Sequence, residues 1–395
     1  MTTTDILAAL HSALDQRKHA NQFRTRRIIE PIDATHIRIG SSTYINFASN
    51  NYLALTHHPA LISASTSATT QFGTGAAASS LITGYTPLHA AAESSLASWK
   101  KSDRALLFPS GYQANHAAIQ TISAIADATN KPLRFLLDKL CHASLIDAVR
   151  ATGKPFRIFP HNHLPKLERL LAEADPTELQ SVITESIFSM DGDSADLPAL
   201  AQLKSKYPFL LLLDEAHATG VYGPHGAGLA AELNLSHLAD LTTLTLSKSL
   251  ASQGGVICAS SAWCDAILNF GRASLYTTNI PPSIAATAIA ALDILRTEPT
   301  RQHRLRLIAK QFRADLTNIG FTLPPGDSPI IPLILLSEQS ALNAADTLLS
   351  QGLLTIPVRP PTVPPNTSRL RLTLSSAHTD QEISQLLSAL KNLPR

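Results

Sequence analysis

The chain has few charged residues and no run of charges of one sign. Asp, Glu, Lys and Arg make up 16% of the 395 residues, whereas soluble domains usually contain ~25%. The formal net charge is +2, so no electrostatic feature favours nucleic acid or an anionic membrane as a partner. Hydrophobic residues make up 44%, which is typical of a folded globular protein and argues against long disordered stretches. The length allows two or three domains with a large buried core.

Cysteines and long apolar runs are also scarce. The three cysteines have neither metal-ligand nor disulfide spacing, which suits a reducing compartment: Cys141, Cys258 and Cys264. The first residues lack the basic segment and apolar core of a signal peptide. The most apolar stretch, 284–295, is interrupted by Asp293 and is too short to cross a bilayer. We therefore expect a cytoplasmic protein without a metal site.

The middle of the chain alternates between apolar runs of strand length and helical patterns such as 113–125 and 166–174. This alternation predicts an α/β fold with a mainly parallel seven-stranded sheet and helices on both faces. Most of the runs are continuously apolar, as expected for strands buried on both sides. The expected strands are 104–108, 133–137, 156–159, 181–184, 209–213, 242–246 and 255–259.

The two ends of the chain have other patterns. Ile6, Leu10 and Leu14 recur on one face of an expected first helix, and a short strand-like stretch follows at 43–47. After Pro281 two long helical patterns precede short strand-like pieces. We therefore expect an N-terminal segment over 1–50, a large α/β domain over 51–281 and a small α+β domain over 282–395.

Polar residues follow several of the expected strands, where ligands bind in open α/β sheets. After the first strand, Gly111 permits close approach of the backbone, and the helix that starts there offers N–H groups to a phosphate. An ordinary capped helix start is the alternative. After later strands, His142 is equally compatible with a structural histidine, and the segment 188–193 with an Asp-Gly turn.

Asp214 ends a strongly apolar strand, so its carboxylate is expected at the edge of a buried sheet. A carboxylate there requires a partner, and a pyridinium nitrogen would form a charge-assisted hydrogen bond with it. His217 could reach the same ligand. A helix N-cap aspartate with an incidental histidine is the other interpretation.

Lys248 follows the strand 242–246 and comes just after Thr245 and Ser247. A lysine there is explained by an amine that forms a Schiff base with a carbonyl cofactor, although a surface lysine at a strand end remains the alternative. Taken together, the phosphate-binding turn, His142, Asp214 and Lys248 predict a single cofactor site.

These residues fall in an ordered series that resembles the α-oxoamine synthase family of fold-type I pyridoxal-phosphate enzymes over nearly the whole chain. The motifs are Asn50-Asn51-Tyr52-Leu53, Ser110-Gly111-Tyr112, His142-Ala143-Ser144, Phe188-Ser189-Met190-Asp191-Gly192-Asp193, Asp214-Glu215-Ala216-His217-Ala218-Thr219-Gly220 and Thr245-Leu246-Ser247-Lys248.

The resemblance implies a role for each cofactor residue. Lys248 would carry pyridoxal 5'-phosphate and move the proton at the substrate Cα. Asp214 would pair with the pyridine nitrogen, and His142 would stack on the ring. The remaining cofactor contacts would come from His217 and Ser189 at the ring oxygen, from the Gly111–Tyr112 backbone and Thr245 at the phosphate, and from Thr277 and Thr278 of the second subunit of a homodimer.

The resemblance also implies substrates. The segments 359–364 and 369–374 are most similar to the family member that condenses L-alanine with pimeloyl-CoA, or a pimeloyl carrier protein, in biotin synthesis. Arg371 would bind the amino-acid carboxylate, and Arg24, Asn50 and Thr362 would line the substrate sites. Members that use glycine with acetyl-CoA, or succinyl-CoA or palmitoyl-CoA, are the alternatives.

The chain departs from the family pattern at two positions, and two other functions are alternatives. The glycine-rich stretch 73–81 lacks the family's basic residue, and Ala251 stands where glycine is common. The stretch 73–78 matches the G-x-G-x-x-A pattern of a nicotinamide dehydrogenase, but that pattern must follow a strand and here follows a helical segment. A non-catalytic scaffold subunit would lack the lysine, and Lys248 is present.

Overall fold

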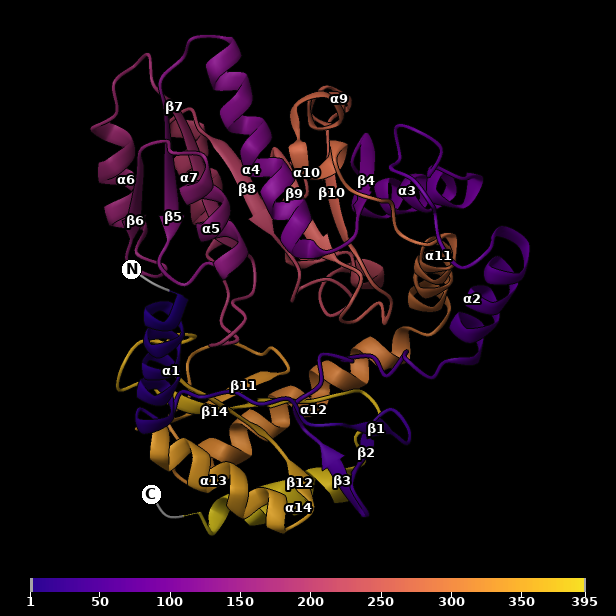
Figure 1. Cartoon of the computed structure of the whole chain (residues 1–395), viewed down its shortest axis with the longest axis vertical. Helices are drawn as coiled ribbons and strands as arrows, with labels where there is room; N and C mark the ends of the chain where they lie inside the picture. The colour runs from indigo at the N-terminus through magenta and orange to yellow at the C-terminus, as the bar shows by residue number, and fades with distance from the viewer. Residues whose placement is uncertain (1–2, 394–395) are drawn as a thin grey trace. The chain divides into compact units, whose positions relative to one another are not determined.

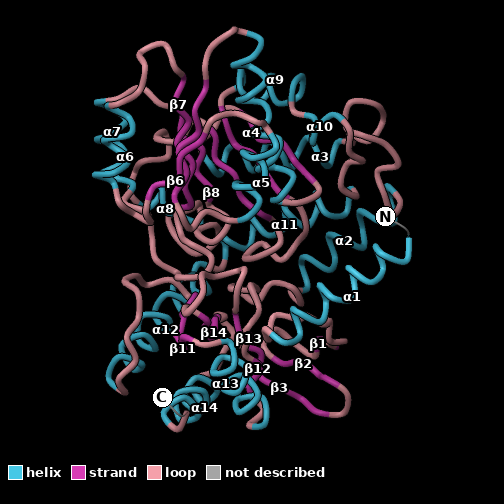
Figure 2. The backbone as a smooth tube through the Cα atoms, turned by 60° about the vertical axis from the view of Figure 1, so that its left-hand side comes forward, coloured by secondary structure: helices cyan, strands magenta, loops and turns pink. Residues whose placement is uncertain are grey.

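The computed structural model describes residues 3–393. Its contacts divide the chain into two compact units. The larger unit comprises Asn50–Ser189 and Asp193–Arg306, and the smaller unit comprises Met1–Ser49, Met190–Gly192 and Leu307–Arg395. Figure 1 colours the chain by residue number, and Figure 2 distinguishes helices from strands. Each unit is described by itself.

The larger unit contains a seven-stranded sheet with the order β4-β10-β9-β8-β7-β5-β6. Its strands are β4 (Arg104–Phe108), β5 (Leu133–Asp138), β6 (Phe156–Phe159), β7 (Leu179–Glu185), β8 (Leu210–Asp214), β9 (Leu241–Thr245) and β10 (Gly255–Ala259). The pairs from β6 to β9 are parallel, and β10 is antiparallel to both β9 and β4. The mainly parallel seven-stranded sheet expected from the sequence is confirmed.

The strand order places the ends of several strands around one crevice. β6 lies on one side of β5, whereas β7, β8 and β9 follow on the other side. Chain connections therefore leave the sheet in opposite directions at β5 and β7, and such a switch point opens a crevice at the carboxyl ends of the strands. β7 and β8 are buried over almost their whole length, which explains why their sequences are apolar without alternation.

The helices of the larger unit pack against the sheet and against one another. They are α2 (Pro59–Phe72), α3 (Pro87–Lys100), α4 (Gly111–Ala128), α5 (Ala143–Ala151), α6 (Leu164–Ala172), α7 (Leu197–Lys206), the 3-10 turn η1 (Pro224–Gly226), α8 (Leu229–Glu232), α9 (Ser261–Phe270), α10 (Arg272–Leu275) and α11 (Pro282–Thr297). Alanine-rich α4 packs with α5 and α9 into one hydrophobic cluster with the central strands. This packing fixes the N-terminus of α4 beside the carboxyl ends of the central strands.

The smaller unit contains two small sheets and four helices among the described residues. One sheet has the order β1-β2-β3-β12 and the other the order β11-β14-β13. The strands are β1 (Glu30–Pro31), β2 (His36–Ile39), β3 (Ser42–Asn46), β11 (Ile330–Leu336), β12 (Leu353–Leu354), β13 (Ile356–Val358) and β14 (Ser368–Thr373), and the helices are α1 (Thr3–His19), α13 (Glu338–Ser350), α14 (Asp380–Lys391) and most of α12 (Pro299–Asn318). The apolar side chains of α1 that recur on one face, Ile6 and Leu10 among them, are exposed.

The contact units differ from the domains expected from the sequence at three places. The N-terminal segment up to Ser49 and residues 190–192 group with the C-terminal residues in the smaller unit. Residues 282–306 group with the larger unit, whereas the sequence assigned them to the C-terminal domain. The physical reason is α11, whose alanine-rich surface packs against α2 and α3. The domain boundaries at 50/51 and 281/282 stay a prediction for the functional division of the chain.

Between residues 3 and 393, no helix is both long and apolar enough to cross a membrane.

Candidate active site

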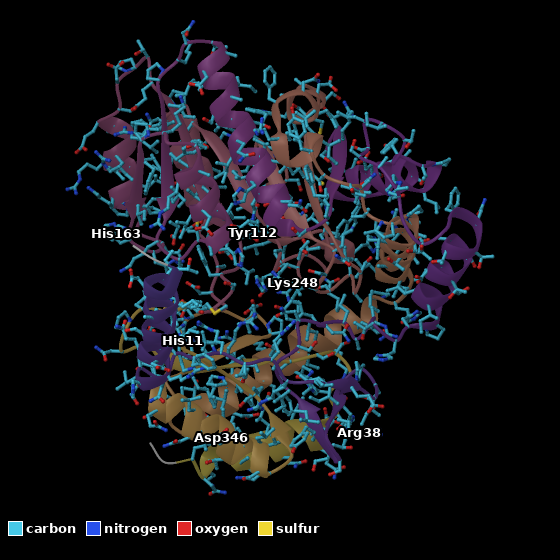
Figure 3. All side chains as sticks on the ribbon, viewed as in Figure 1. His11, Arg38, Tyr112, His163, Lys248 and Asp346 are labelled. Carbon is cyan, nitrogen blue, oxygen red and sulfur yellow. The ribbon has the colours of Figure 1, made fainter. Side chains whose placement is uncertain are left out.

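A cavity of about 260 Å³ lies at the carboxyl ends of the central strands of the larger unit. It is bordered by the start of α4, by the start of α5 and by the residues that end β7, β8 and β9. The lining residues are Ser110, Gly111, Tyr112, Asn115, His142, Ser144, Glu185, Asp214, Ala216, His217, Thr243, Leu244, Thr245, Ser247 and Lys248. Figure 3 labels two of them, Tyr112 at the start of α4 and Lys248 beyond the end of β9.

The turn before α4 forms one end of the cavity. Ser110 caps the helix, since its Oγ accepts a hydrogen bond from Gln113 N at 3.1 Å. A Cβ added to Gly255 would lie 2.4 Å from the Ser110 carbonyl oxygen, so glycine is required for β10 to approach this turn. At the end of β9, Thr245 Oγ1 lies 2.8 Å from Ser247 Oγ. Helix N–H groups beside two hydroxyls make this end suitable for an anion.

Asp214 is held at the base of the cavity by two donors. The backbone N–H of Ala216 donates to Oδ1 and the Asn115 amide donates to Oδ2, both at 2.9 Å. The same Asn115 nitrogen donates to Ser144 Oγ at 2.9 Å. Asp214 is only 6% exposed, so its carboxylate has a fixed orientation toward the cavity.

Lys248 starts a chain of hydrogen bonds that runs into the core. Its Nζ lies 2.9 Å from His217 Nε2, and His217 Nδ1 lies 2.7 Å from the hydroxyl of Tyr52. The Tyr52 hydroxyl donates to Asn50 Oδ1 at 3.2 Å. The consistent donor order has the lysine amine donating to Nε2 and the Nδ1–H donating to Tyr52. Buried Tyr52 thereby sets the tautomer and orientation of His217.

His142 lies at the start of α5 on the border of the cavity. Its Nδ1 accepts a hydrogen bond from Ser144 N at 3.2 Å and lies 2.8 Å from Ser144 Oγ. Removal of the ring from bulk water lowers its pKa, and Lys248 lowers it further, while Asp214 acts in the opposite direction. A neutral imidazole presents a flat face that can pack on an aromatic ligand.

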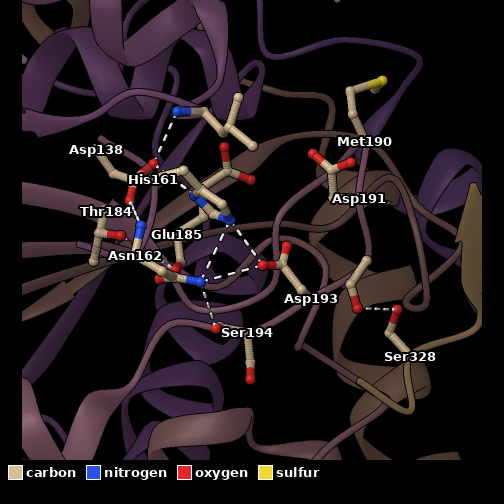
Figure 4. A network of polar contacts seen from close by, with 12 residues as sticks. Asp138, His161, Asn162, Thr184, Glu185, Met190, Asp191, Asp193, Ser194 and Ser328 are labelled. Atoms are coloured by element: carbon tan, nitrogen blue, oxygen red, sulfur yellow. Dashed lines mark hydrogen bonds and ion pairs between the residues drawn. The ribbon is translucent and has the colours of Figure 1, made fainter. Parts of the chain in front are cut away.

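A second polar network lies at the ends of β5 and β7 (Figure 4). His161 Nδ1 lies 2.9 Å from Asp138 Oδ1, and its Nε2 lies 2.7 Å from Asp193 Oδ2. Burial alone would lower the pKa of His161, but its hydrogen bonds to these two carboxylates raise it to about 10. Phe188 N donates to Asp193 O at 2.9 Å, so the network fixes the segment that begins with Phe188 and the buried Ser189.

Comparisons with known proteins show the family to which this chain belongs. Residues 42–390 match the family model described as aminotransferase class I and II. The chain belongs to this family. The 8-amino-7-oxononanoate synthase of Cellvibrio japonicus is 37% identical over 382 residues, covering 96% of this chain and 94% of that protein.

Two solved structures narrow the assignment within the family. The serine palmitoyltransferase of S. paucimobilis, solved with bound PLP and myriocin, has a TM-score of 0.90 at 26% identity, covering 99% of this chain and 98% of that one. The 8-amino-7-oxononanoate synthase of Francisella tularensis has a TM-score of 0.76 at 26% identity, covering 88% and 97%. The expected fold-type I class, its α-oxoamine synthase branch, the enzymatic nature of the chain and pyridoxal phosphate as cofactor are confirmed.

The residues of the cavity fit the cofactor of the family. A pyridine nitrogen requires a fixed carboxylate, a phosphate requires N–H groups and hydroxyls, and an aldehyde requires an amine. Asp214 supplies the carboxylate, and Lys248 supplies the amine. The start of α4 and Thr245 supply the N–H groups and a hydroxyl, and all of these line one cavity. Three buried lining atoms, Asn115 Oδ1, Glu185 Oε1 and Thr243 Oγ1, have no hydrogen-bond partner in the described part of the chain.

Some of the expected site residues lie elsewhere. Thr277 and Thr278 are outside the cavity lining, and Thr277 Oγ1 accepts a hydrogen bond from Gln113 at 3.3 Å. In the smaller unit, Arg24 Nη2 donates to Thr362 Oγ1 at 3.1 Å. Arg371 on β14 is buried and donates to Thr373 Oγ1 at 3.1 Å. The roles of these residues stay predictions.

The nicotinamide alternative has no support in the fold. The glycine-rich stretch starts at Gly73, which caps the C-terminus of α2, so it does not follow a strand as a dinucleotide-binding turn must.

Sequence reasoning missed three residues of the site. Asn115 follows Gly111 by one helical turn, a spacing that places both on one face of α4. Tyr52 belongs to the motif that begins at Asn50, and its reach to His217 depends on tertiary structure. Glu185 was missed because its strand contains Gln180, Ser181 and Thr184 and is less apolar than the strand that Asp214 ends, so the burial of its last residue is not evident from the sequence.

Proposed function

We propose that this chain is a pyridoxal-phosphate acyltransferase that condenses L-alanine with pimeloyl-CoA, or pimeloyl carrier protein, to 8-amino-7-oxononanoate, with release of the thiol and carbon dioxide. The observation that carries the chemistry is the cavity that brings the Asp214 carboxylate and the Lys248 amine together at the strand ends. The full-length relative with this name supports the choice of substrates. The reducing cytoplasm remains the expected compartment.

The residues of the cavity would hold the cofactor at fixed positions. Lys248 would bind it covalently, and Asp214 would pair with the ring nitrogen, where a charge-assisted hydrogen bond contributes roughly 1.5–3 kcal/mol. His142 would stack on the ring. The remaining contacts would come from His217 and Ser189 at the ring oxygen, and from the Gly111–Tyr112 backbone and Thr245 at the phosphate.

The bound cofactor supplies an electron sink for bonds that break at the substrate Cα. Lys248 Nζ would take the proton from the Cα of alanine and return it after the new carbon–carbon bond has formed and carbon dioxide has left. His217, oriented by Tyr52, lies 2.9 Å from this amine and would keep it directed at the reacting carbon. The two donors on Asp214 would keep its carboxylate oriented toward the ring nitrogen.

Substrate recognition would use further residues of the chain and of a second subunit. Arg371 would bind the amino-acid carboxylate, for which a guanidinium offers paired donors. Arg24, Asn50 and Thr362 would line the substrate sites, and the contact between Arg24 and Thr362 supports a common function for these two. Thr277 and Thr278 would contact the cofactor of the partner subunit in a homodimer.

A second candidate has one specific observation in its favour. The serine palmitoyltransferase structure has the higher TM-score, 0.90 against 0.76. The alternative function is therefore condensation of L-serine with a long-chain acyl thioester by the same residues. Condensation of glycine with an acyl thioester is a further alternative within the family.

The test is a matrix of amino acids and acyl thioesters. The holoenzyme is incubated with L-alanine, L-serine or glycine, each with pimeloyl-CoA, palmitoyl-CoA or acetyl-CoA, and the products are identified by mass spectrometry. We expect 8-amino-7-oxononanoate from L-alanine and pimeloyl-CoA at the highest kcat/KM. A product from serine and palmitoyl-CoA with a higher kcat/KM would contradict the proposed substrates and leave the cofactor chemistry intact.

A further inference from the structure

Glu185 occupies a position in the cavity to which the proposed function gives no role. It is the last residue of β7 and pairs in register with Asp214 at the end of β8. The two side chains are 2% and 6% exposed, and both line the cavity. Two acidic side chains therefore lie side by side in a region shielded from water.

The hydrogen bonds of the two acids differ. Asp214 accepts from a donor on each oxygen, Ala216 N on Oδ1 and Asn115 on Oδ2. Glu185 Oε1 is buried and has no hydrogen-bond partner among residues 3–393. An ionised oxygen in that state is costly, whereas a protonated carboxyl can donate to a neighbouring acceptor.

The surroundings of Glu185 favour its neutral form. Burial raises its pKa well above the ordinary value, and Asp214 and Asp138 raise it further. Lys248 and a hydrogen bond from the backbone N–H of His142 act in the opposite direction without overcoming burial. Adjacent buried carboxyl groups avoid double ionisation in this way, and Asp214 is the one equipped with donors.

We propose that Glu185 is a positioning residue of the cofactor pocket, a neutral carboxyl that accepts a hydrogen bond from the His142 backbone without adding a second negative charge beside Asp214. It would act through His142, which is proposed to stack on the cofactor ring, and through Asp214, which is proposed to pair with the ring nitrogen. This inference rests on the cofactor-binding roles proposed above for those two residues.

Two substitutions separate the hydrogen-bonding role of Glu185 from its charge. Glu185→Gln keeps the shape and an uncharged polar group, whereas Glu185→Leu keeps the volume and removes hydrogen bonding. Glu173→Gln, at an exposed position after α6, is the matched control. Two measurements do not depend on turnover: the affinity for pyridoxal phosphate, and the pH dependence of the visible absorption of the bound cofactor.

We expect Glu185→Gln to bind the cofactor within about threefold of the unsubstituted protein, with the same pH dependence of absorption. We expect Glu185→Leu to weaken binding by about tenfold or more, since a buried partner is left unpaired, and to shift that pH dependence. Equal damage in both variants would show that the charge of Glu185 is required, and no damage in either would show that it has no role. Either result overturns the proposal.

A third measurement uses the protein without cofactor and tests the neutral carboxyl directly. A group whose folded pKa lies above its unfolded value stabilises the fold at low pH, and this stability is lost as pH rises toward the folded pKa. Glu185→Gln should therefore gain thermal stability relative to the unsubstituted protein as pH rises from 5 to 8. A difference in Tm that does not change over this range contradicts a neutral Glu185.

This third measurement remains informative if the unsubstituted protein fails to bind pyridoxal phosphate. Such a failure would contradict only the proposed function, because the measurement of thermal stability needs no cofactor.

Discussion

Asn115 is the residue on which the position of Asp214 depends most directly. Its amide bridges Asp214 Oδ2 and Ser144 Oγ, each at 2.9 Å, so it joins α4 to the end of β8 and the start of α5. Ser144 in turn contacts His142. One buried amide therefore controls the two groups proposed to contact the nitrogen and the face of the cofactor ring.

We expect Asn115→Leu to weaken cofactor binding by about tenfold to a hundredfold. The variant removes a hydrogen bond to a charged group, which contributes ~1.5–3 kcal/mol. Equilibrium titration with pyridoxal phosphate measures the change, and Gln120→Leu on the same helix but outside the cavity lining is the control. Equal affinities of Asn115→Leu and Gln120→Leu would contradict this role.

At the residue scale, the sequence predicted polar groups that follow strands better than polar groups in a helix, such as Asn115, or in a turn, such as Tyr52. Asp214, His217 and Lys248 could be identified because a polar residue directly after an apolar strand is conspicuous. Asn115 and Tyr52 could not, because their contacts join segments that are far apart in sequence. The partner of a buried polar group is fixed by tertiary packing, which no local pattern encodes.

At the scale of elements, the His161 network secures the segment that carries Ser189. It links the end of β5 to Asp193 through two short contacts, and Asn162 N adds a hydrogen bond to Asp138 Oδ2 at 2.8 Å. A charged imidazole between two carboxylates holds this segment near the strand ends in any state below the pKa of the histidine.

We expect His161→Gln to lower the free energy of unfolding by about 2–4 kcal/mol at pH 6, because removal of one partner leaves buried carboxylates without their counter-charge. The pKa of His161 is raised from 6.5 to about 10, so its stabilisation is complete below about pH 6.5 and is lost as pH rises toward 10. The deficit of the variant should shrink over the same range.

Denaturant unfolding at several pH values measures this deficit. His303→Gln, at an exposed position of α12, is the control and should show no comparable pH dependence. A deficit that stays constant from pH 6 to pH 9.5 would mean that His161 is not charged in the folded protein.

Several strands could be predicted with their bounds, namely β4, β6 and β10. β4 and β10 are mostly buried apolar runs, whereas β6 is largely exposed and is delimited by Pro155 and Pro160. The grouping of α11 could not be predicted in this way. Its alanine-rich sequence is compatible with burial on several sides, and the choice of α2 and α3 as neighbours depends on the fold as a whole.

At the scale of the whole molecule, we expect the proposed site to include residues of a second subunit. Thr277 and Thr278 are outside the lining of the cavity in their own chain. We expect the protein to form a closed, symmetric homodimer in which each site combines Lys248 of one subunit with this threonine pair of the other.

Mixing two inactive variants tests this arrangement. Lys248→Ala lacks the amine in both sites, and the double variant Thr277→Val with Thr278→Val lacks the threonine hydroxyls in both. In mixed dimers one of the two sites is intact, so complete exchange of subunits should give about a quarter of native sites. Activity should therefore rise on mixing. Mixed dimers that form and stay inactive would contradict a shared site.

We expect Lys248 to be the residue that binds the cofactor covalently, and a peptide map tests this. The holoenzyme is reduced with borohydride, digested and analysed by mass spectrometry for a lysine that carries a pyridoxyl group. We predict one modified peptide, with the group on Lys248, and none in Lys248→Ala. A pyridoxyl group on another lysine, or its absence after reduction of a cofactor-saturated protein, would contradict the account.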